Sequence, residues 1–370
     1  MQDTVSHSSP STLERSRAAR AWFGSRWLWP LNDARAIDDL LGLVNPLWSV
    51  EEIRAKVVAI VDETADTRSF VLEPNRHWPG FVAGQYVPVN FERDGRRLQR
   101  CYSLSSSPRA AQLRITVKRQ AAGRMSNALH DGLQVGDVLT LGAPEGCFTL
   151  PLDATPTTVL VGAGSGVTPL MAQLYEMQAA GYAGAVRFVQ VCRTPADAIF
   201  RAELEALAAA WPALTVTFHY TAEAGRLSPS ALQQQLPDGA DHQLMLCGPA
   251  AFMAAVRGEW EARGWGHRVK TEAFSLTLPT VAAEGAAAEV RCGRSEQMFT
   301  AQAGQPLLSE AEAAGLSPRH GCRIGICHAC KCMKKSGTVQ NLLTGEISDA
   351  PDEAIQLCIS AARSDLELDL

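Results

Sequence analysis

Four cysteines near the end of the chain have the spacing of ligands to an iron–sulfur cluster. Cys322, Cys327 and Cys330 form a C-x4-C-x2-C run, and Cys358 follows at a distance. This three-plus-one arrangement is typical of plant-type [2Fe–2S] clusters, in which four thiolates hold the two irons. The spacing therefore predicts a [2Fe–2S] cluster on these four cysteines, and it indicates that the protein transfers electrons.

A structural zinc site is the alternative for the same four thiolates. Zinc ribbons usually present two short pairs of cysteines, whereas this chain presents a run of three and a distant fourth. Gly321 and Gly325 also favour a cluster, because glycine lets backbone N–H groups turn towards sulfur. Cys332 has no place in the pattern, so we expect a packed or peripheral thiol there.

Two polar stretches in the first half of the chain carry the residue types that a flavin with a phosphate tail requires. One reads R-C-Y-S over residues 100–103, and the other reads G-R-M-S-N over residues 123–127. An arginine supplies positive charge, hydroxyl and N–H groups bind oxygens, and an aromatic ring covers the flavin. In isolation, either stretch is better explained as an ordinary strand end with its turn.

A glycine-rich turn and a cysteine turn further along are candidates for binding a nicotinamide cofactor. Residues 162–169 read G-A-G-S-G-V-T-P between an apolar strand and a helix, where glycines allow a phosphate to approach the helix N-terminus. The run differs from the usual G-x-G-x-x-G fingerprint, so a plain structural turn is the alternative. Residues 247–249 read C-G-P directly after an apolar strand, a place where a cysteine is usually part of the core.

Taken in order, these motifs resemble those of the ferredoxin–NADP reductase superfamily, which also has a closing E-x-F, here residues 272–274. The resemblance implies that the flavin is FAD, since G-x-[MV]-S is found in FAD-binding members. It implies that three residues act at the reacting rings, namely Cys247, Ser103 and Glu272. It also implies a set of cofactor-binding residues: Arg100, Tyr102, Ser103, Lys118, Gly123, Met125, Ser126, Gly162, Gly164, Gly166, Thr168, Gly248, Pro249 and Phe274.

The choice between NADPH and NADH depends on the residues that would meet the ribose. Arg193 follows the second strand of the nucleotide region, where no acidic residue stands to bind a free ribose hydroxyl, so a 2′-phosphate and hence NADPH is favoured. Many members of the superfamily place an arginine directly after the threonine that Thr221 resembles, but this chain has Ala222 there. NADH therefore stays open, and Arg226 is a candidate substitute for the missing arginine.

The elements that must position these residues change in character along the chain. Short apolar runs between turn residues predict an antiparallel β-barrel for the flavin over residues 51–152. Alternating strands and helices predict an α/β parallel sheet for the nicotinamide cofactor over 153–275. A linker over 276–287 then leads to an α+β ferredoxin domain of the β-grasp type over 288–370. We therefore expect a multidomain protein, as a length of 370 residues suggests.

Residues 1–50 form an N-terminal extension that fits none of these units. It is rich in tryptophan, with Trp22, Trp27, Trp29 and Trp48, and it carries arginines at positions 15, 17, 20 and 26. One interpretation is an arm packed on the barrel, because aromatic side chains bury large areas. The other is a peripheral contact with a membrane or a partner protein.

Composition argues against other classes of function. A formal net charge of −5 gives no general attraction to nucleic acid. No apolar run reaches the roughly 18 residues that cross a bilayer, and the first residues lack the order of a secretory signal. We expect a cytoplasmic protein whose only membrane contact, if any, is at the inner face.

The domain order predicts a route for electrons from NAD(P)H through FAD and the [2Fe–2S] cluster to an acceptor protein. A hydride carries two electrons and the cluster accepts one at a time, a mismatch that a flavin resolves. The chain is similar to the flavodoxin/ferredoxin reductases that serve membrane-bound fatty-acyl desaturases and related di-iron oxygenases, whose leader resembles LVNPLWSV here. The alternatives are the reductase of a soluble ring-hydroxylating or demethylating oxygenase, and a redox-sensing or structural metal-binding module.

Basic residues surround the predicted cluster loop, and no acidic residue occurs from position 317 to 337. They are Arg319, Arg323, Lys331, Lys334 and Lys335. One interpretation is a rim that steers an acidic partner, which predicts reduction rates that fall as salt rises. The alternative is an ordinary solvated rim.

Overall fold

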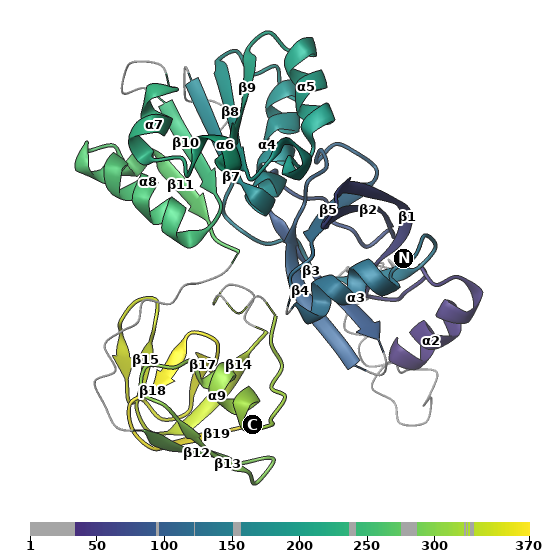
Figure 1. Ribbon diagram of the computed structural model, residues 1–370. Coiled ribbons are helices and arrows are strands. Elements are labelled where there is room, and N and C mark those ends of the chain that lie inside the picture. The colour runs from purple at the N-terminus through teal and green to yellow at the C-terminus, as the bar shows by residue number, and fades with distance from the viewer. Residues whose placement is uncertain are drawn as a thin grey trace, which may run out of the picture.

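The structure is a computed structural model of the 370-residue chain. It describes residues 34–93, 96–121, 123–150, 157–236, 242–274, 287–321, 323, 325 and 329–370. Three units follow one another along the chain, and Figure 1 shows the ferredoxin unit below the nucleotide unit, with the barrel to one side. Most of the N-terminal extension and nearly all of the linker lie outside the described residues. Within the described part, no helix has the length and hydrophobicity to cross a membrane.

The first unit is a six-stranded antiparallel sheet in the order β4-β3-β6-β1-β2-β5. Its strands are β1 (Ile53–Thr64), β2 (Thr67–Pro74), β3 (Tyr86–Arg93), β4 (Arg96–Ser103), β5 (Leu113–Lys118) and β6 (Val138–Leu141). A bridge between Leu104 and Ile115 joins the two edge strands, so the sheet closes into a barrel. Helix α3 (Arg124–Gly132) buries Met125 and Leu129 in the barrel core.

The second unit is a five-stranded parallel sheet in the order β11-β10-β7-β8-β9. Its strands are β7 (Thr157–Ala163), β8 (Ala185–Cys192), β9 (Leu214–Tyr220), β10 (His242–Cys247) and β11 (Val269–Glu272), and its helices are α4 (Val167–Ala179), α5 (Arg201–Ala210), α6 (Thr221–Ala224), α7 (Pro229–Gln234) and α8 (Ala250–Ala262). The strand order reverses between β7 and β10. In such sheets, the crevice at the carboxyl ends of the strands beside this reversal is where ligands bind.

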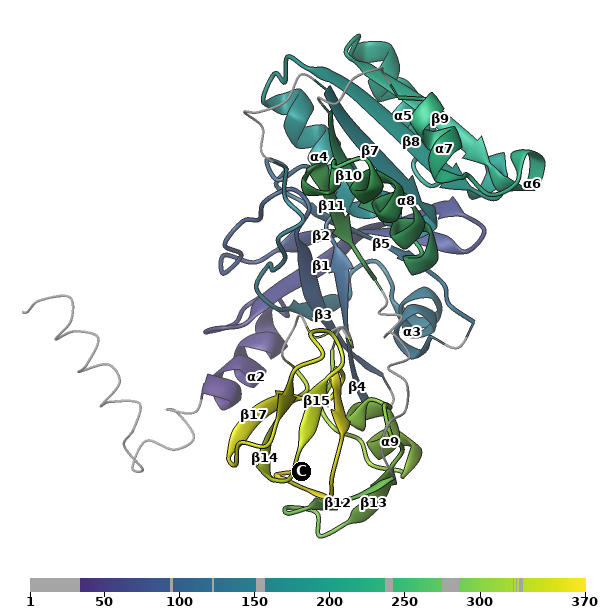
Figure 2. The same cartoon turned by 90° about the vertical axis from the view of Figure 1, so that its left-hand side faces the viewer.

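The third unit has a five-stranded mixed sheet in the order β13-β12-β19-β14-β17 and a small sheet in the order β16-β15-β18. Its elements are β12 (Ala288–Cys292), β13 (Met298–Ala301), α9 (Leu307–Ala313), β14 (Lys331–Ser336), β15 (Val339–Asn341), β16 (Ile347–Ser348), β17 (Glu353–Gln356), β18 (Ser360–Ala362) and β19 (Leu366–Leu368). Leu307, Leu308 and Ala311 of α9 pack into the core of this sheet, which also buries Cys330 and Cys358. Figure 2 shows α9 beside the strands.

The described end of the N-terminal extension packs on the barrel through helix α2 (Ala34–Val44) and the turn after it. Asp38 accepts hydrogen bonds from the Ser49 hydroxyl (2.9 Å) and the Val50 N–H (2.6 Å). Asn75 of the barrel donates to the Leu47 carbonyl at 3.1 Å. Residues 47–50 are thus tied to the barrel and to α2, whereas Trp48 is 51% exposed, so a packed arm stays a prediction. The three tryptophans before this segment lie outside the described residues.

Ion pairs join the barrel to the nucleotide unit. Arg114 pairs with Glu203 at 2.9 Å and lies 4.4 Å from the centre of the Phe200 ring, and Arg109 pairs with Glu176 at 2.8 Å. Because the Arg114 pair is half-buried, it is screened less than a surface pair. These contacts hold the two units together beside the carboxyl edge of the parallel sheet, where predicted flavin and nicotinamide residues meet.

Candidate functional site

Strand β4 delivers the R-C-Y-S residues to the end of the barrel that faces the other two units. Side chains alternate along a strand, so Arg100 and Tyr102 share one face while Ser103 points to the other. The half-buried Arg100 guanidinium donates hydrogen bonds to the carbonyls of Gln99 (2.8 Å) and Gly321 (3.3 Å), with no carboxylate partner among the described residues. A desolvated cation whose partners are carbonyls suits an anionic ligand, so this site fits the phosphate or ring oxygens of FAD.

The second flavin stretch lies at the start of α3, with Gly123 as its N-cap. A Cβ at Gly123 would lie 2.5 Å from the Ser126 Oγ, which explains the glycine. Ser126 accepts a hydrogen bond from the Gln120 N–H (3.1 Å), and Met125 is buried in the barrel core. These contacts shape the turn, and backbone N–H groups at a helix N-terminus suit a pyrophosphate.

Lys118, the remaining predicted flavin residue, pairs with Asp66 at 3.1 Å. The side-chain hydrogen bonds that Asp66 accepts hold its pKa below the usual value, against the effect of its burial. Lys118 therefore has a carboxylate partner within the barrel. To bind FAD as well, its ammonium would have to contact both Asp66 and the cofactor.

The glycine-rich turn connects β7 to α4 through a short 3-10 helix, Gly164–Gly166. Gly164 has a φ of +56° with open space where a Cβ would stand, and both features permit close approach of a ligand. A Cβ at Gly162 would lie 2.9 Å from the Val167 Cα. The Thr168 hydroxyl donates to the Ser165 carbonyl at 2.9 Å, which holds the first turn of α4.

The cysteine turn packs directly against the glycine-rich turn at the strand-order reversal. A Cβ at Gly166 would lie 2.2 Å from the carbonyl oxygen of Cys247, and one at Gly248 would lie 2.8 Å from the Ala163 Cβ. Pro249 is the N-cap residue of α8. Both glycines are therefore required for the two turns to touch, and together they form the floor of the crevice where a nicotinamide would lie.

The three residues predicted to act at the reacting rings converge in this crevice. Cys247 and Glu272 are register partners at the carboxyl ends of β10 and β11. The Ser103 hydroxyl, from the barrel, donates to Glu272 Oε2 at 3.5 Å. Burial raises the pKa of Glu272 to about 8, against a lowering effect of the Ser103 hydrogen bond. Burial, and then Glu272, raise the pKa of the Cys247 thiol well above its usual value, so both groups are protonated at neutral pH.

The remaining predicted residues lie at the edges of the crevice. Phe274 follows β11 with 42% of its surface exposed, which leaves a ring available to cover a flavin. Arg193 and Arg226 are exposed, and the Arg193 carbonyl accepts from the Ala222 N–H at 2.9 Å, so the positions named for a ribose phosphate lie on neighbouring loops.

We expect the rate of flavin reduction to depend on the protonation of Glu272. Below pH 8 its carboxyl keeps a proton, whereas above pH 8 a carboxylate would stand beside a ring that must accept a hydride. Stopped-flow reduction by NADPH should slow about tenfold from pH 7 to pH 9 in the natural protein and stay level in Glu272→Gln. The stability of the folded protein should also fall relative to Glu272→Gln as pH rises from 4.5 to about 8, since the unfolded carboxyl ionises first.

Glu145→Gln is the matched control for this prediction, since Glu145 accepts from the Tyr86 hydroxyl elsewhere on the barrel. Its pH profile should follow that of the natural protein. A Glu272→Gln profile that still bends at pH 8 would assign the titration to another group.

Two of the four predicted cluster ligands are described. Cys330 and Cys358 are buried, with their sulfur atoms 3.2 Å apart, although the two residues come from different loops. Cys322 and Cys327 lie outside the described residues. Gly325, between them in sequence, has a φ of +78°, and its carbonyl accepts from the Gln356 side chain at 2.7 Å. Two converging thiols beside a left-handed glycine fit a [2Fe–2S] cluster.

Cys332 is a packed thiol, as expected from the sequence. It is buried in the core of the ferredoxin unit, and burial raises its pKa to about 11. Its side chain packs in this core two residues after Cys330, so it remains outside the predicted ligand set.

The basic rim expected around the cluster is smaller than the sequence suggested. Lys334 is fully buried, and its ammonium donates to the carbonyls of Gly337 (2.9 Å) and Ala350 (2.6 Å). Lys335 pairs with Asp352 at 2.8 Å, and Arg323 forms two hydrogen bonds to Glu312. Lys334 was therefore wrongly assigned to the surface, because the alternation of β14 turns it inward. Of the five basic residues of this rim, Arg319 and Lys331 are exposed and have no such partner among the described residues.

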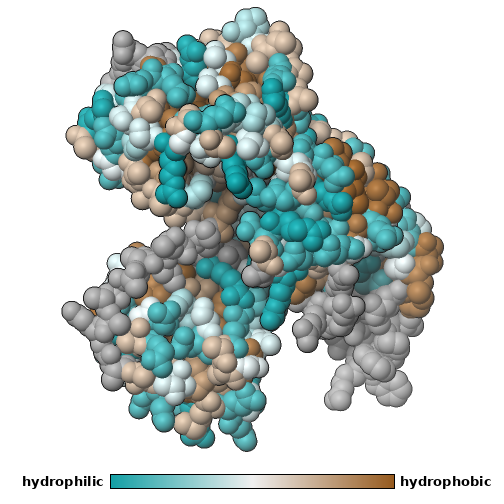
Figure 3. All heavy atoms as spheres, viewed as in Figure 1, coloured by the Kyte–Doolittle hydropathy of each residue, from teal (hydrophilic) through white to brown (hydrophobic). Residues whose placement is uncertain are grey.

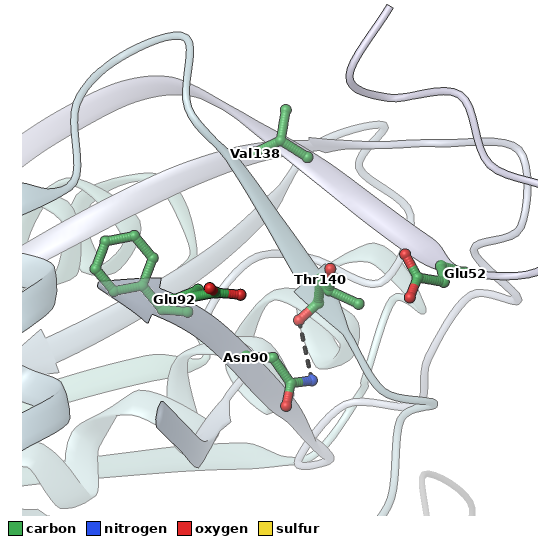
Figure 4. Close-up of a pocket in the computed structure, with 6 residues that line it drawn as sticks. Glu52, Asn90, Glu92, Val138 and Thr140 are labelled. Carbon is green, nitrogen blue, oxygen red and sulfur yellow. Dashed lines mark hydrogen bonds between the residues drawn. The ribbon is translucent and has the colours of Figure 1, made fainter. Parts of the chain in front are cut away.

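A hollow of about 290 Å³ on the outer wall of the barrel lies apart from this site. Figure 4 shows Asn90 donating to the Thr140 carbonyl there (3.3 Å), between the carboxylates of Glu52 and Glu92. None of the predicted site residues lines it.

The fold and the site together define a class of protein: a reductase for flavin and nicotinamide cofactors joined to a ferredoxin module. The sequence matches the oxidoreductase FAD-binding domain over residues 54–150 and the oxidoreductase NAD-binding domain over 160–258. It matches the 2Fe-2S iron-sulfur cluster binding domain over 290–363. These families occur in the order that the motifs predicted.

Similar proteins match over nearly the whole chain. An NADPH oxidoreductase of Mycobacterium tuberculosis is 35% identical over 338 residues, which cover 90% of this chain and 88% of the relative. The glycine betaine monooxygenase reductase subunit of Pseudomonas aeruginosa is 30% identical over 352 residues, covering 87% and 96%. The solved structure of phthalate dioxygenase reductase is 27% identical with a TM-score of 0.61, covering 86% and 98%.

The chain therefore belongs to the ferredoxin–NADP reductase-type family of NAD(P)H-dependent oxidoreductases that carry FAD and a C-terminal [2Fe–2S] domain. The expected cofactors, fold class and enzyme class are confirmed. The particular residues that hold each cofactor, and the domain boundaries, stay predictions.

Proposed function

We propose that this chain passes electrons from NADPH through FAD and its [2Fe–2S] cluster to an oxygenase. The observation that carries the proposal is the position of β4, whose Ser103 meets Glu272 of the nicotinamide crevice while its Arg100 contacts the cluster loop at Gly321. FAD, when bound, would accept two electrons as a hydride and release them singly, as a one-electron cluster requires. Glu272 and Cys247 would hold their protons and close the crevice around the two rings.

The names of similar proteins support an oxygenase as the acceptor. A glycine betaine monooxygenase reductase subunit and phthalate dioxygenase reductase both match over most of their length. NADPH is supported by the exposed Arg193 and Arg226 and by the name of the mycobacterial relative. Arg319, Lys331 and Leu343 are exposed around the cluster, and Leu343 lies against Gly325 of its loop. We expect the acceptor to dock there, with an apolar centre and a modest dependence on salt.

The test is anaerobic stopped-flow spectroscopy of the purified protein with NADPH, followed by mixing with the oxygenase component of a glycine betaine monooxygenase. We expect the flavin and iron–sulfur absorption to bleach, and one NADPH to reduce two one-electron equivalents of acceptor. A colourless protein, or one whose bands do not respond to NADPH, would overturn the proposal. Either of these two results would instead support the alternative of a structural or redox-sensing metal-binding module.

A membrane-bound acyl desaturase is the second candidate acceptor, and helix α2 favours it. Leu40, Leu43, Val44 and Trp48 are between 51% and 84% exposed. Figure 3 shows hydrophobic side chains at the edge of the molecule where Figure 1 places α2. The sequence just before this helix carries four arginines and three tryptophans with no acidic residue from position 15 to 32. Apolar and basic side chains together suit the surface of an anionic membrane.

We expect the protein to co-sediment with vesicles containing phosphatidylglycerol and not with neutral vesicles. The double substitution Leu43→Ser and Val44→Ser should weaken binding about tenfold, because two side chains no longer enter the apolar interface. Val61→Ser, at another exposed apolar position on β1, is the control and should bind normally. If the double variant binds vesicles as well as Val61→Ser does, or if the natural protein does not bind them, helix α2 gives no support for a membrane-bound acceptor. The soluble oxygenase is then the remaining candidate.

A further inference from the structure

Arg100 lies between two sites that the electron route keeps separate. Its guanidinium is at the predicted flavin-binding end of β4, and its Nη1 donates at 3.3 Å to the carbonyl of Gly321, the residue before the predicted ligand Cys322. The contact joins segments of the barrel and the ferredoxin unit that are 221 positions apart. It is therefore a contact between two domains, and one of its partners is a backbone atom of the cluster loop.

The charges around this contact are balanced for Arg323 and not for Arg100. The Arg323 guanidinium donates two hydrogen bonds to the Glu312 carboxylate, which balances its positive charge. One of its nitrogens also lies 2.9 Å from the His320 ring nitrogen. Among the described residues, Arg100 donates hydrogen bonds to carbonyls alone, and burial and the nearby Arg323 both lower its pKa. An anion beside Arg100 would neutralise its positive charge by accepting hydrogen bonds from the other guanidinium N–H groups, while Nη1 continues to donate to the Gly321 carbonyl.

We propose that Arg100 is a positioning residue that binds FAD and the cluster loop at the same time. It follows that FAD binding and docking of the ferredoxin domain stabilise each other, since coupling between two binding events is reciprocal. The inference rests on the proposed flavin site. It assigns to Arg100 a second role, which is to hold the cluster loop against the flavin.

Hydrogen exchange measured by mass spectrometry tests this on the full chain with its cluster in place and its flavin removed. Adding FAD to the natural protein should slow exchange in peptides of the barrel and also in peptides covering 316–323. In Arg100→Lys at saturating FAD, the barrel should still be protected and 316–323 should not, because an ammonium lacks the fork that spans two partners. Arg119→Lys is the control, since Arg119 pairs with Asp131 on the exposed barrel surface.

The reciprocal measurement needs no substitution. Removing the cluster from the natural protein by chelation should weaken FAD binding about fivefold, and this dependence should vanish in Arg100→Lys. Protection of the barrel without protection of 316–323 in the natural protein would overturn the inference while leaving the flavin site intact. Failure of FAD to bind the natural protein at all would instead overturn the proposed function.

Discussion

Cys358→Ser should produce a flavoprotein that still oxidises NADPH with ferricyanide but reduces its protein acceptor at least about 100-fold more slowly. The sulfur atoms of Cys358 and Cys330 lie 3.2 Å apart in a buried pair, so a hydroxyl at either position removes a thiolate that the cluster requires. The flavin crevice is built from other units and should be unaffected. Iron content and the electron paramagnetic resonance signal of the reduced protein provide the measurement.

Cys332→Ser is the matched control, because Cys332 is a buried cysteine only two residues from Cys330. Burial keeps its thiol neutral, and the substituted protein should keep its iron and its resonance signal. Loss of the cluster in Cys332→Ser together with its retention in Cys358→Ser would mean that the ligand set is wrong.

Gly166→Ala should slow reduction of the flavin by NADPH about 100-fold, because small displacements of the reacting groups have effects of this size. The added Cβ would lie 2.2 Å from the carbonyl oxygen of Cys247 and 2.5 Å from its carbon, and both belong to the backbone. The glycine-rich turn and the cysteine turn must then separate. We also expect a loss of about 1–3 kcal/mol in the free energy of unfolding.

Dithionite distinguishes this effect from loss of the cofactors, since it should reduce the flavin and cluster of Gly166→Ala normally. Gly258→Ala is the control, because Gly258 lies in α8 with open space at its Cβ position. That substitution should leave the reduction rate unchanged. Normal hydride transfer in Gly166→Ala would show that the contact between the two turns is not needed.

The roles predicted for Cys247 and Glu272 came from the family resemblance, because a cysteine directly after an apolar strand is by itself usually part of the core. The structure places these two residues as register partners at the carboxyl ends of neighbouring parallel strands, which is the edge of an α/β sheet where ligands bind. The convergence of Ser103 with them followed from the family resemblance, since it depends on how the barrel packs against the nucleotide unit. No local pattern near Ser103 indicates that packing.

Two features had no usable signal in the sequence. Lys334 stands in a basic run that suggests a surface, yet β14 alternates. The buried ammonium donates to the carbonyls of Gly337 and Ala350 and lies 3.5 Å from a carboxylate oxygen of Glu353. The contact between Arg100 and Gly321 depends on the placement of one domain on another. In both cases backbone carbonyls are among the partners, and carbonyls are present at every residue, so residue types alone could not identify the contact.

The contact between the barrel and the ferredoxin unit has a kinetic consequence, because both belong to one polypeptide. Only a short stretch separates Phe274, at the flavin crevice, from Ala288, where the ferredoxin sheet begins. Tethers of this kind maintain an effective concentration on the order of millimolar, even where the direct contact is weak. Electron transfer from flavin to cluster should therefore be first order and independent of protein concentration, and added free ferredoxin should compete with the attached domain only at similarly high concentration.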